Sequence, residues 1–281
     1  MNPATVLFGI LLYTAQWAIS YAQKQVLEVL NASQGVRDVF GFSAPTGRVE
    51  VISGKRSTSS IRRIFNEGRA SLELNYSKSH GGLNDHDRRL LQDIYYKSES
   101  VIEWGVGEST LIAQYTGVQR YVGVDSARDW IAKVSTTAPS NYKFMWVNIG
   151  PILAWGKPKD PGWKNNWPQY SIAPLASEPE AFDFYFIDGR FRVASVCAAF
   201  LHAGLSNRNH TSFRVGMHDF QERHEAQSYG AVLSIADVVD GYDPERHDES
   251  RMFRIVIMRR KPTATTKQIL DIWTKYALVW N

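Results

Sequence analysis

Residues 100–110 read SVIEWGVGEST and combine a short apolar run with a glycine turn. Val101, Ile102 and Trp104 are apolar or β-favouring side chains, which predicts a short buried strand. Two glycines follow at once, and a helical pattern occupies residues 109–116. A glycine turn between a buried strand and a helix lets the backbone approach a ligand, so we expect a site at the carboxyl end of this strand.

The rest of the chain repeats this alternation of strands and helices. Near-continuous apolar strands separated by helices are typical of a parallel sheet with helices on both faces. We therefore predict an α/β doubly wound, Rossmann-like, seven-stranded and mostly parallel sheet with an antiparallel strand at its edge. The expected strands are 101–104, 121–125, 143–149, 182–189, 212–220, 231–239 and 252–260, and the expected helices include 127–134, 192–204 and 266–280.

Two further segments frame the expected site. Asn84 precedes a helical pattern with two aspartates in its first turn, which predicts an N-capped helix that leads into the first strand. Residues 150–181 are rich in Pro, Trp and Gly and too long for a simple connection. We interpret this segment, which carries Trp155, Trp163 and Trp167, as a lid or substrate wall.

The pattern of the N-terminal residues predicts a targeting segment rather than a catalytic site. Residues 6–13 form an apolar run, and small residues near position 22 suit a signal-peptide cleavage site. We predict a signal peptide or membrane anchor at 1–22, an extension at 23–80 and a catalytic-type domain at 81–281. The expected location is the secretory pathway, lumenal or secreted; the alternative is an anchored protein with a cytoplasmic body, because the first basic residue follows the apolar run.

Composition excludes several classes of protein. The chain has 281 residues, 44% of them hydrophobic, so it suffices for a large core. Its net charge of +4 is small, and no nucleic-acid-binding motif occurs, so we expect no nucleic acid partner. Cys197, the single cysteine, excludes an internal disulfide and stands in an apolar helical pattern that predicts a buried thiol.

The glycine turn departs from the dinucleotide-binding fingerprint. Thr110 stands where G-x-G-x-x-G has its third glycine, which disfavours NAD(P) or FAD. The motifs EWGVGEST (103–110), NIGPILAWGKP (148–158), FDFYFIDGRFRVA (182–194) and MHDFQER (217–223) together resemble class I S-adenosylmethionine-dependent methyltransferases. Within that class they resemble a poorly characterised methyltransferase-like group with EWGxGxST, WGxP, IDGRFRVA and HDF motifs.

This resemblance implies a cofactor and the residues that bind it. Glu103 would lie near the methionine end of S-adenosylmethionine, Gly105 and Gly107 would pass beneath it, and Asp125 would bind the ribose hydroxyls. Ser109 and Thr110 are candidates for further contacts, and both also suit a helix N-cap. From the residues alone, Glu103 also suits a buried acid with internal partners, and Asp125 also suits a helix cap.

The candidate catalytic residues are Asp188, His218 and Asp219, at the ends of two neighbouring predicted strands. A base there would activate a hydroxyl acceptor. Two carboxylates and water would also suit Mg²⁺ or Ca²⁺, but the third ligand of such a site is not evident. The alternative is a structural role in which these acids pair with Arg190, Arg192 or Arg223.

The predicted function is therefore S-adenosylmethionine-dependent methyl transfer to an oxygen or nitrogen of a small molecule or glycan. The cofactor predicted is S-adenosylmethionine, with a divalent metal as an alternative addition. The expected partner is the acceptor, together with a membrane in the alternative in which residues 1–22 form an anchor. Two alternatives remain open: a noncatalytic methyltransferase-like binding or scaffold module, and an NAD(P)-dependent oxidoreductase.

Overall fold

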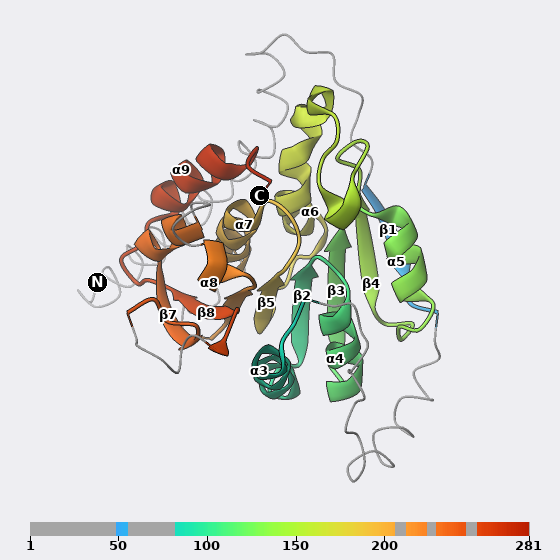
Figure 1. Ribbon diagram of the computed structural model, residues 1–281, viewed down its shortest axis with the longest axis horizontal. Coiled ribbons are helices and arrows are strands. Elements are labelled where there is room, and N and C mark those ends of the chain that lie inside the picture. Colours follow the sequence, from blue (N-terminus) through green and yellow to red (C-terminus); the bar gives the residue numbers. More distant parts are fainter. Residues whose placement is uncertain (1–48, 56–81, 206–211, 224–228, 246–251, 281) are drawn as a thin grey trace, which may run out of the picture. The chain divides into compact units, whose positions relative to one another are not determined.

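The computed structural model describes residues 49–55, 82–205, 212–223, 229–245 and 252–280, all within one unit that spans Thr46–Asn281. An eight-stranded sheet with the order β1-β4-β3-β2-β5-β6-β8-β7 forms its centre (Figure 1). The strands are β1 (Val49–Ser53), β2 (Ser100–Trp104), β3 (Arg120–Asp125), β4 (Lys143–Val147), β5 (Phe184–Ile187), β6 (Arg214–Met217), β7 (Ala236–Gly241) and β8 (Val256–Arg260).

The sheet confirms the predicted fold class. Strands β4, β3, β2, β5 and β6 are mutually parallel, while β8 runs antiparallel between β6 and β7. The sheet has one strand more than expected, because β1 pairs antiparallel with β4. This strand lies within residues 23–80, which the sequence analysis assigned to an extension.

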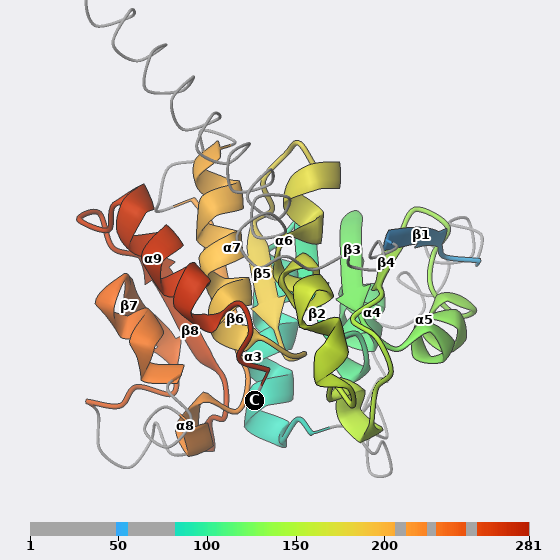
Figure 2. The ribbon, with the colours of Figure 1, turned by 90° about the horizontal axis from the view of Figure 1, so that it is seen from above.

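Helices cover both faces of the sheet because the side chains of each strand alternate between them. On β2, the Glu103 carboxylate contacts Tyr95 of α3 (Asp85–Tyr96), whereas the Trp104 indole donates to the Tyr170 carbonyl of α6 (Trp167–Ser177). Figures 1 and 2 show α6, α7 and α9 on one side of the strands and α3 and α4 on the other. The helices are α3 (Asp85–Tyr96), α4 (Glu108–Thr116), α5 (Arg128–Ser135), α6 (Trp167–Ser177), α7 (Arg192–Leu205), α8 (Phe220–Arg223) and α9 (Thr266–Tyr276).

The predicted cap of α3 is present. The Asn84 side chain accepts from the Asp87 amide at 2.9 Å, and the Asp87 carboxylate accepts from the Asn84 amide in return. Asp87 also accepts from the backbone amides of Arg254 and Ile255, which lead into β8. The cap therefore joins α3 to the antiparallel part of the sheet.

Two segments differ from the sequence-based prediction. Residues 231–234 belong to a 3-10 helix, η3 (Tyr229–Ser234), and β7 begins only at Ala236. The segment 150–181 is mostly ordered into η1 (Ala154–Gly156), η2 (Pro161–Asn166) and α6. Its prolines and tryptophans resemble a loop, but Pro161 stands in the first turn of η2, where its missing amide costs nothing.

Predictions for the N-terminal targeting segment fall on residues outside the described part of the chain, as do most of residues 23–80. Among the described residues, no helix combines the length and the apolar character of a membrane span. Cys197 is buried in α7 as expected, and burial raises the pKa of its thiol.

Candidate functional site

A cavity of about 980 Å³ opens at the carboxyl ends of β2, β3 and β5. This is where ligands bind in open α/β sheets, and the volume lies at the upper end of the range for small-molecule sites. Predicted site residues Gly105, Gly107, Asp125 and Asp188 line it. The wall also includes Glu108, Trp130, Lys133, Leu153, Trp155, Tyr170 and Arg190.

The two glycines of the turn have different roles. Gly105 has a φ of 91°, and a Cβ there would lie 2.5 Å from the Gly189 amide nitrogen after β5. Gly105 is thus required for the close approach of two backbone segments. At Gly107 a Cβ would meet nothing within 4 Å, because this position faces the open cavity. Its missing side chain leaves space for a ligand at the start of α4.

Asp125 ends β3 and is half-buried at the cavity wall. Its carboxylate accepts from the Val106 amide at 3.2 Å and from the Ala127 amide at 2.8 Å. Burial raises its pKa to about 6, and these backbone hydrogen bonds act in the opposite direction. The carboxylate is fixed between the glycine turn and the start of α5, where it is able to accept hydrogen bonds from a ligand.

Glu103 points to the opposite side of β2 from the Trp104 indole, into a cage of hydroxyl groups. Its carboxylate accepts from Tyr95 at 3.0 Å, from Thr110 at 2.9 Å and, through a short bond, from Tyr121. The side chain is fully buried, and this burial raises its pKa to about 7 although the hydroxyl groups, including that of Ser109, counteract it.

The cage separates three predicted cofactor ligands from the cavity. Glu103, Ser109 and Thr110 are all buried and none is part of the cavity wall. The Thr110 hydroxyl accepts from the Gly107 amide, so it also caps the first turn of α4. In this geometry the acid within the strand binds α3, α4 and β3 together.

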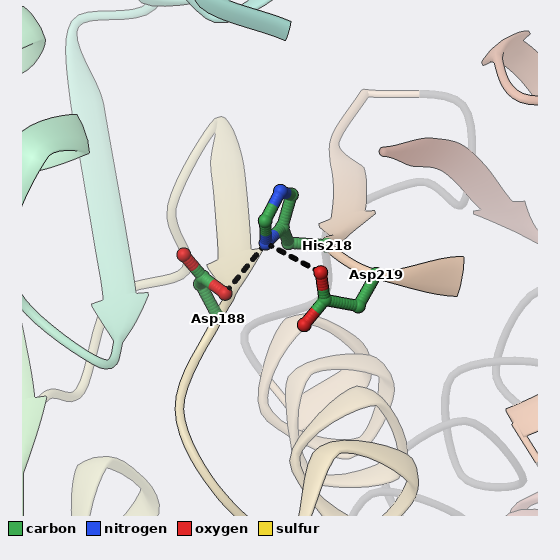
Figure 3. A group of neighbouring side chains, drawn as sticks. All are labelled: Asp188, His218 and Asp219. Atoms are coloured by element: carbon green, nitrogen blue, oxygen red, sulfur yellow. Dashed lines mark hydrogen bonds and ion pairs between the residues drawn. The ribbon is translucent and has the colours of Figure 1, made fainter. Parts of the chain in front are cut away.

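The three predicted catalytic residues do come together (Figure 3). His218 Nδ1 lies 2.9 Å from Asp188 Oδ1 and 3.4 Å from Asp219 Oδ1. Asp188 follows β5 and lines the cavity with a side chain that is 24% exposed, while His218 and Asp219 follow β6 and are buried. Figure 3 shows the second carboxylate oxygen of Asp188 pointing away from the other two residues.

Arginines neutralise this cluster. Buried Arg192 donates to Asp188 Oδ1 at 3.1 Å and to Asp219 Oδ2 at 3.0 Å, and Arg254 forms an ion pair with Asp219 at 2.5 Å. On the far side of the imidazole, His218 Nε2 lies 3.8 Å from Asp87 of α3. Three carboxylates therefore meet two guanidinium groups and an imidazole, and the set is neutral when the imidazole carries a proton.

This environment sets the protonation of the cluster. Burial alone would lower the pKa of His218, but Asp188, Asp87 and Asp219 outweigh it and raise the pKa to about 9. Burial alone would raise the pKa of Asp188, but His218 and Arg192 lower it. His218 is thus an imidazolium at neutral pH, which is unsuited to act as a base.

The same geometry tests the predicted metal. The ligand atoms of Asp188, His218 and Asp219 lie within 4.8 Å of one another, which is compact enough for an ion. However, Arg192 already binds both carboxylates, so a metal ion would have to displace a buried guanidinium. The structural pairing with Arg192 considered from the sequence is therefore present.

Some residues that line the cavity had no ligand role in the sequence-based prediction. The Trp130 indole donates to the Val106 carbonyl at 2.6 Å and borders the Asp125 end of the cavity. Trp155 is 73% exposed with a φ of 63°, and its carbonyl accepts from Arg190 Nε at 2.9 Å. Of the three tryptophans that were expected in a lid or substrate wall, Trp155 lines the cavity, and Trp163 and Trp167 do not.

Comparison with known proteins supports the fold. No protein-family model matches the chain, and no curated protein matches it significantly. A methyltransferase-like protein from Silicibacter pomeroyi DSS-3 superposes with a TM-score of 0.52 and 18% identity, covering 73% of this chain and 99% of that one. The chain shares the fold of this methyltransferase-like protein. An O-methyltransferase from Bacillus cereus in complex with SAH has a TM-score of 0.37 and 13% identity, over 82% of this chain and 97% of that one.

The structure brings Gly105, Gly107, Asp125 and Asp188 to one cavity, and it places Glu103, Ser109, Thr110, His218 and Asp219 behind that wall.

Proposed function

We propose that the protein transfers a methyl group from S-adenosylmethionine to an oxygen or nitrogen of a small molecule or glycan. The observation that carries this proposal is Asp125, fixed by two backbone amides at the end of β3 and exposed to a cavity that Gly107 leaves open. Methyl transfer needs no nucleophile on the protein, only alignment of the acceptor and exclusion of water. A wall of glycine backbone, aromatic side chains and acids meets that need.

The described residues fit S-adenosylmethionine, which would supply an electrophilic methyl group. The carboxylate of Asp125 would accept from the ribose hydroxyls, and the open position at Gly107 would admit the ligand next to the start of α4. Trp130 offers an apolar surface next to Asp125. Glu103 is not needed for this contact, since its carboxylate is already satisfied within the cage.

Titration calorimetry with S-adenosylmethionine and S-adenosylhomocysteine tests the proposal. We expect binding that Asp125→Ala weakens by about tenfold or more, since a charge-assisted pair of hydrogen bonds is lost. Asp129→Ala removes an exposed acid four residues later and is the matched control. Absence of heat with a folded protein, or equal affinity in both variants, would contradict the proposal.

A noncatalytic binding module is the second candidate. It is favoured by the cluster behind Asp188, because His218 is occupied by acids and not available as a base. Such a module would bind S-adenosylhomocysteine and lose affinity with Asp125→Ala, but it would transfer no labelled methyl group to any acceptor. Transfer assays on a binding-competent protein therefore separate the two candidates.

A further inference from the structure

Asp188 is the acid that the fold presents to the reacting end of the cavity. Its contacts in the described structure run through Oδ1, to His218 and Arg192, while Figure 3 shows the other oxygen directed away from this cluster. Its backbone is also fixed, since its amide donates to the Trp104 carbonyl of β2 at 2.7 Å. The cluster therefore fixes the carboxylate through Oδ1, while the side chain stays 24% exposed at the cavity.

The described wall of the cavity offers little to remove a proton from an alcohol. His218 lies behind Asp188 between three acids, and Glu108 pairs with Arg88 at 2.5 Å. Asp125 is held by two backbone amides at the other end of the cavity. An alkyl hydroxyl needs a base or a metal to become a good acceptor, whereas a neutral amine already has a nucleophilic lone pair.

We propose, resting on the methyl transfer proposed above, that the acceptor atom is an amine nitrogen bound by Asp188, and that Arg192 and His218 position this carboxylate. Asp188 accepts a hydrogen bond from an N–H of the neutral amine, which directs the nitrogen lone pair toward the methyl carbon. The two cations behind Asp188 keep it in one orientation and in its ionised form.

The step balances without a base or metal. The amine first loses its extra proton to water. Its lone pair then forms the C–N bond while the C–S bond breaks and leaves its electron pair on sulfur. Positive charge moves from sulfur to nitrogen, next to the Asp188 carboxylate, which stabilises the charge where it develops. The methylated ammonium then leaves, or returns one proton to water.

One rim of the cavity is apolar. Leu153 and Trp155 are 53% and 73% exposed and line it, and the Trp155 carbonyl accepts from Arg190, two residues after Asp188. An amine on an apolar or aromatic body would match both features, with the ring against the rim and the nitrogen at Asp188. Benzylamine and benzyl alcohol are therefore suitable matched probes, because they differ only in the group that meets the acid. Benzylamine is protonated at neutral pH, so its nitrogen carries the positive charge that the amine acquires on methylation.

We would titrate each probe into protein saturated with S-adenosylhomocysteine and follow binding by NMR. Benzylamine should bind about tenfold more tightly than benzyl alcohol, as expected for a hydrogen bond to a charged group. Asp188→Asn should remove this preference, and Asp237→Asn, an exposed acid on β7, should retain it. The affinity for S-adenosylhomocysteine should stay within a few fold in Asp188→Asn.

Equal binding of the two probes to the wild-type protein would overturn the proposal, whether or not the variant folds. A preference that survives Asp188→Asn would overturn the assignment to this residue, as would a large loss of S-adenosylhomocysteine affinity. Labelled methyl groups recovered on alcohol oxygens would also overturn it. If S-adenosylhomocysteine itself does not bind, the function proposed above has failed, and that result is separate from these.

Discussion

Replacing Glu103 by glutamine tests what the acid in the first parallel strand does. The change keeps the shape of the side chain and one oxygen acceptor but removes the charge. With the amide oxygen in the position of Oε2, Thr110 at 2.9 Å and Tyr121 can still donate to it, and the Tyr95 hydroxyl can rotate to accept from the new amide. The hydroxyl cage therefore remains largely satisfied in the variant.

The magnitude follows from the pKa of Glu103, which burial raises to about 7 from an ordinary 4.5. The unfolded chain ionises this group at lower pH than the folded chain, so the free energy of unfolding falls as the pH rises from 4.5 to 7. Above pH 7 both states are ionised, and the loss is constant at about 3 kcal/mol. Below pH 4.5 the group is protonated in both states and the loss disappears.

Urea denaturation at pH 5 and pH 8 measures this effect. We expect Glu103→Gln to be more stable than the wild type at pH 8 by about 1–3 kcal/mol, and to lack most of that gain at pH 5. Asp125, whose pKa burial also raises, titrates in both proteins and cancels in the difference. Glu99→Gln, at an exposed position just before β2, is the control and should show no such difference.

Two results would refute the structural role of Glu103. One is a variant that is less stable than the wild type at pH 8 by the same amount as at pH 5. The other is a loss of S-adenosylhomocysteine affinity of tenfold or more in a variant of normal stability. The second result would restore Glu103 to the cofactor site, as the family resemblance implied.

Three further predictions concern the cavity and the cluster. Gly105→Ala should lower the melting temperature sharply, because its Cβ would lie 2.5 Å from the Gly189 amide at a φ of 91°. Gly107→Ala should melt like the wild type yet bind S-adenosylhomocysteine more weakly. A stable Gly105→Ala together with an unstable Gly107→Ala would contradict this assignment. His218→Gln should cost about 3 kcal/mol of unfolding free energy at pH 6 and much less above pH 9, since a pKa raised to about 9 gives stability that is lost as the pH rises through that value. EDTA and Mg²⁺ should leave the melting temperature unchanged because Arg192 already neutralises the acids, whereas a rise with Mg²⁺ would indicate a metal site.

The fold could be predicted because short sequence patterns determine most of its strands and helices. The apolar run before Gly105 and the amphipathic runs between the strands specify each of these elements within about ten residues, and the structure has them where expected except at residues 231–234. The strand β1 could not be predicted in the same way, because its five residues gain their partner only from β4, about ninety residues further on. The helix α6 was hidden by prolines and tryptophans, whose tolerance in a first turn depends on packing.

The site could be predicted only where backbone geometry decides it. Glycines and strand-end acids such as Gly107 and Asp125 belong at the cavity whatever their neighbours are. The role of Glu103 depends on Tyr95 and Tyr121, two hydroxyls from different elements that the sequence does not connect with it.

The contacts of His218 and Asp219 show why the residue types in a motif do not determine which of them acts as a base or a metal ligand. The sequence brings His218 together with Asp188 and Asp219 and suggests a base or a metal ligand. The structure shows Asp188 at 2.9 Å from the imidazole and adds a third acid, Asp87, which caps α3 and lies 131 residues before His218. With that third acid present, the imidazole is favoured as a cation, and Arg192 completes the neutral set. In the proposed reaction the acceptor then meets Asp188, through the carboxylate oxygen that is directed away from the cluster. A carboxylate that is bound by cations is a weak base, which disfavours an alcohol acceptor. The same carboxylate stabilises a nitrogen that becomes positive, which favours an amine acceptor.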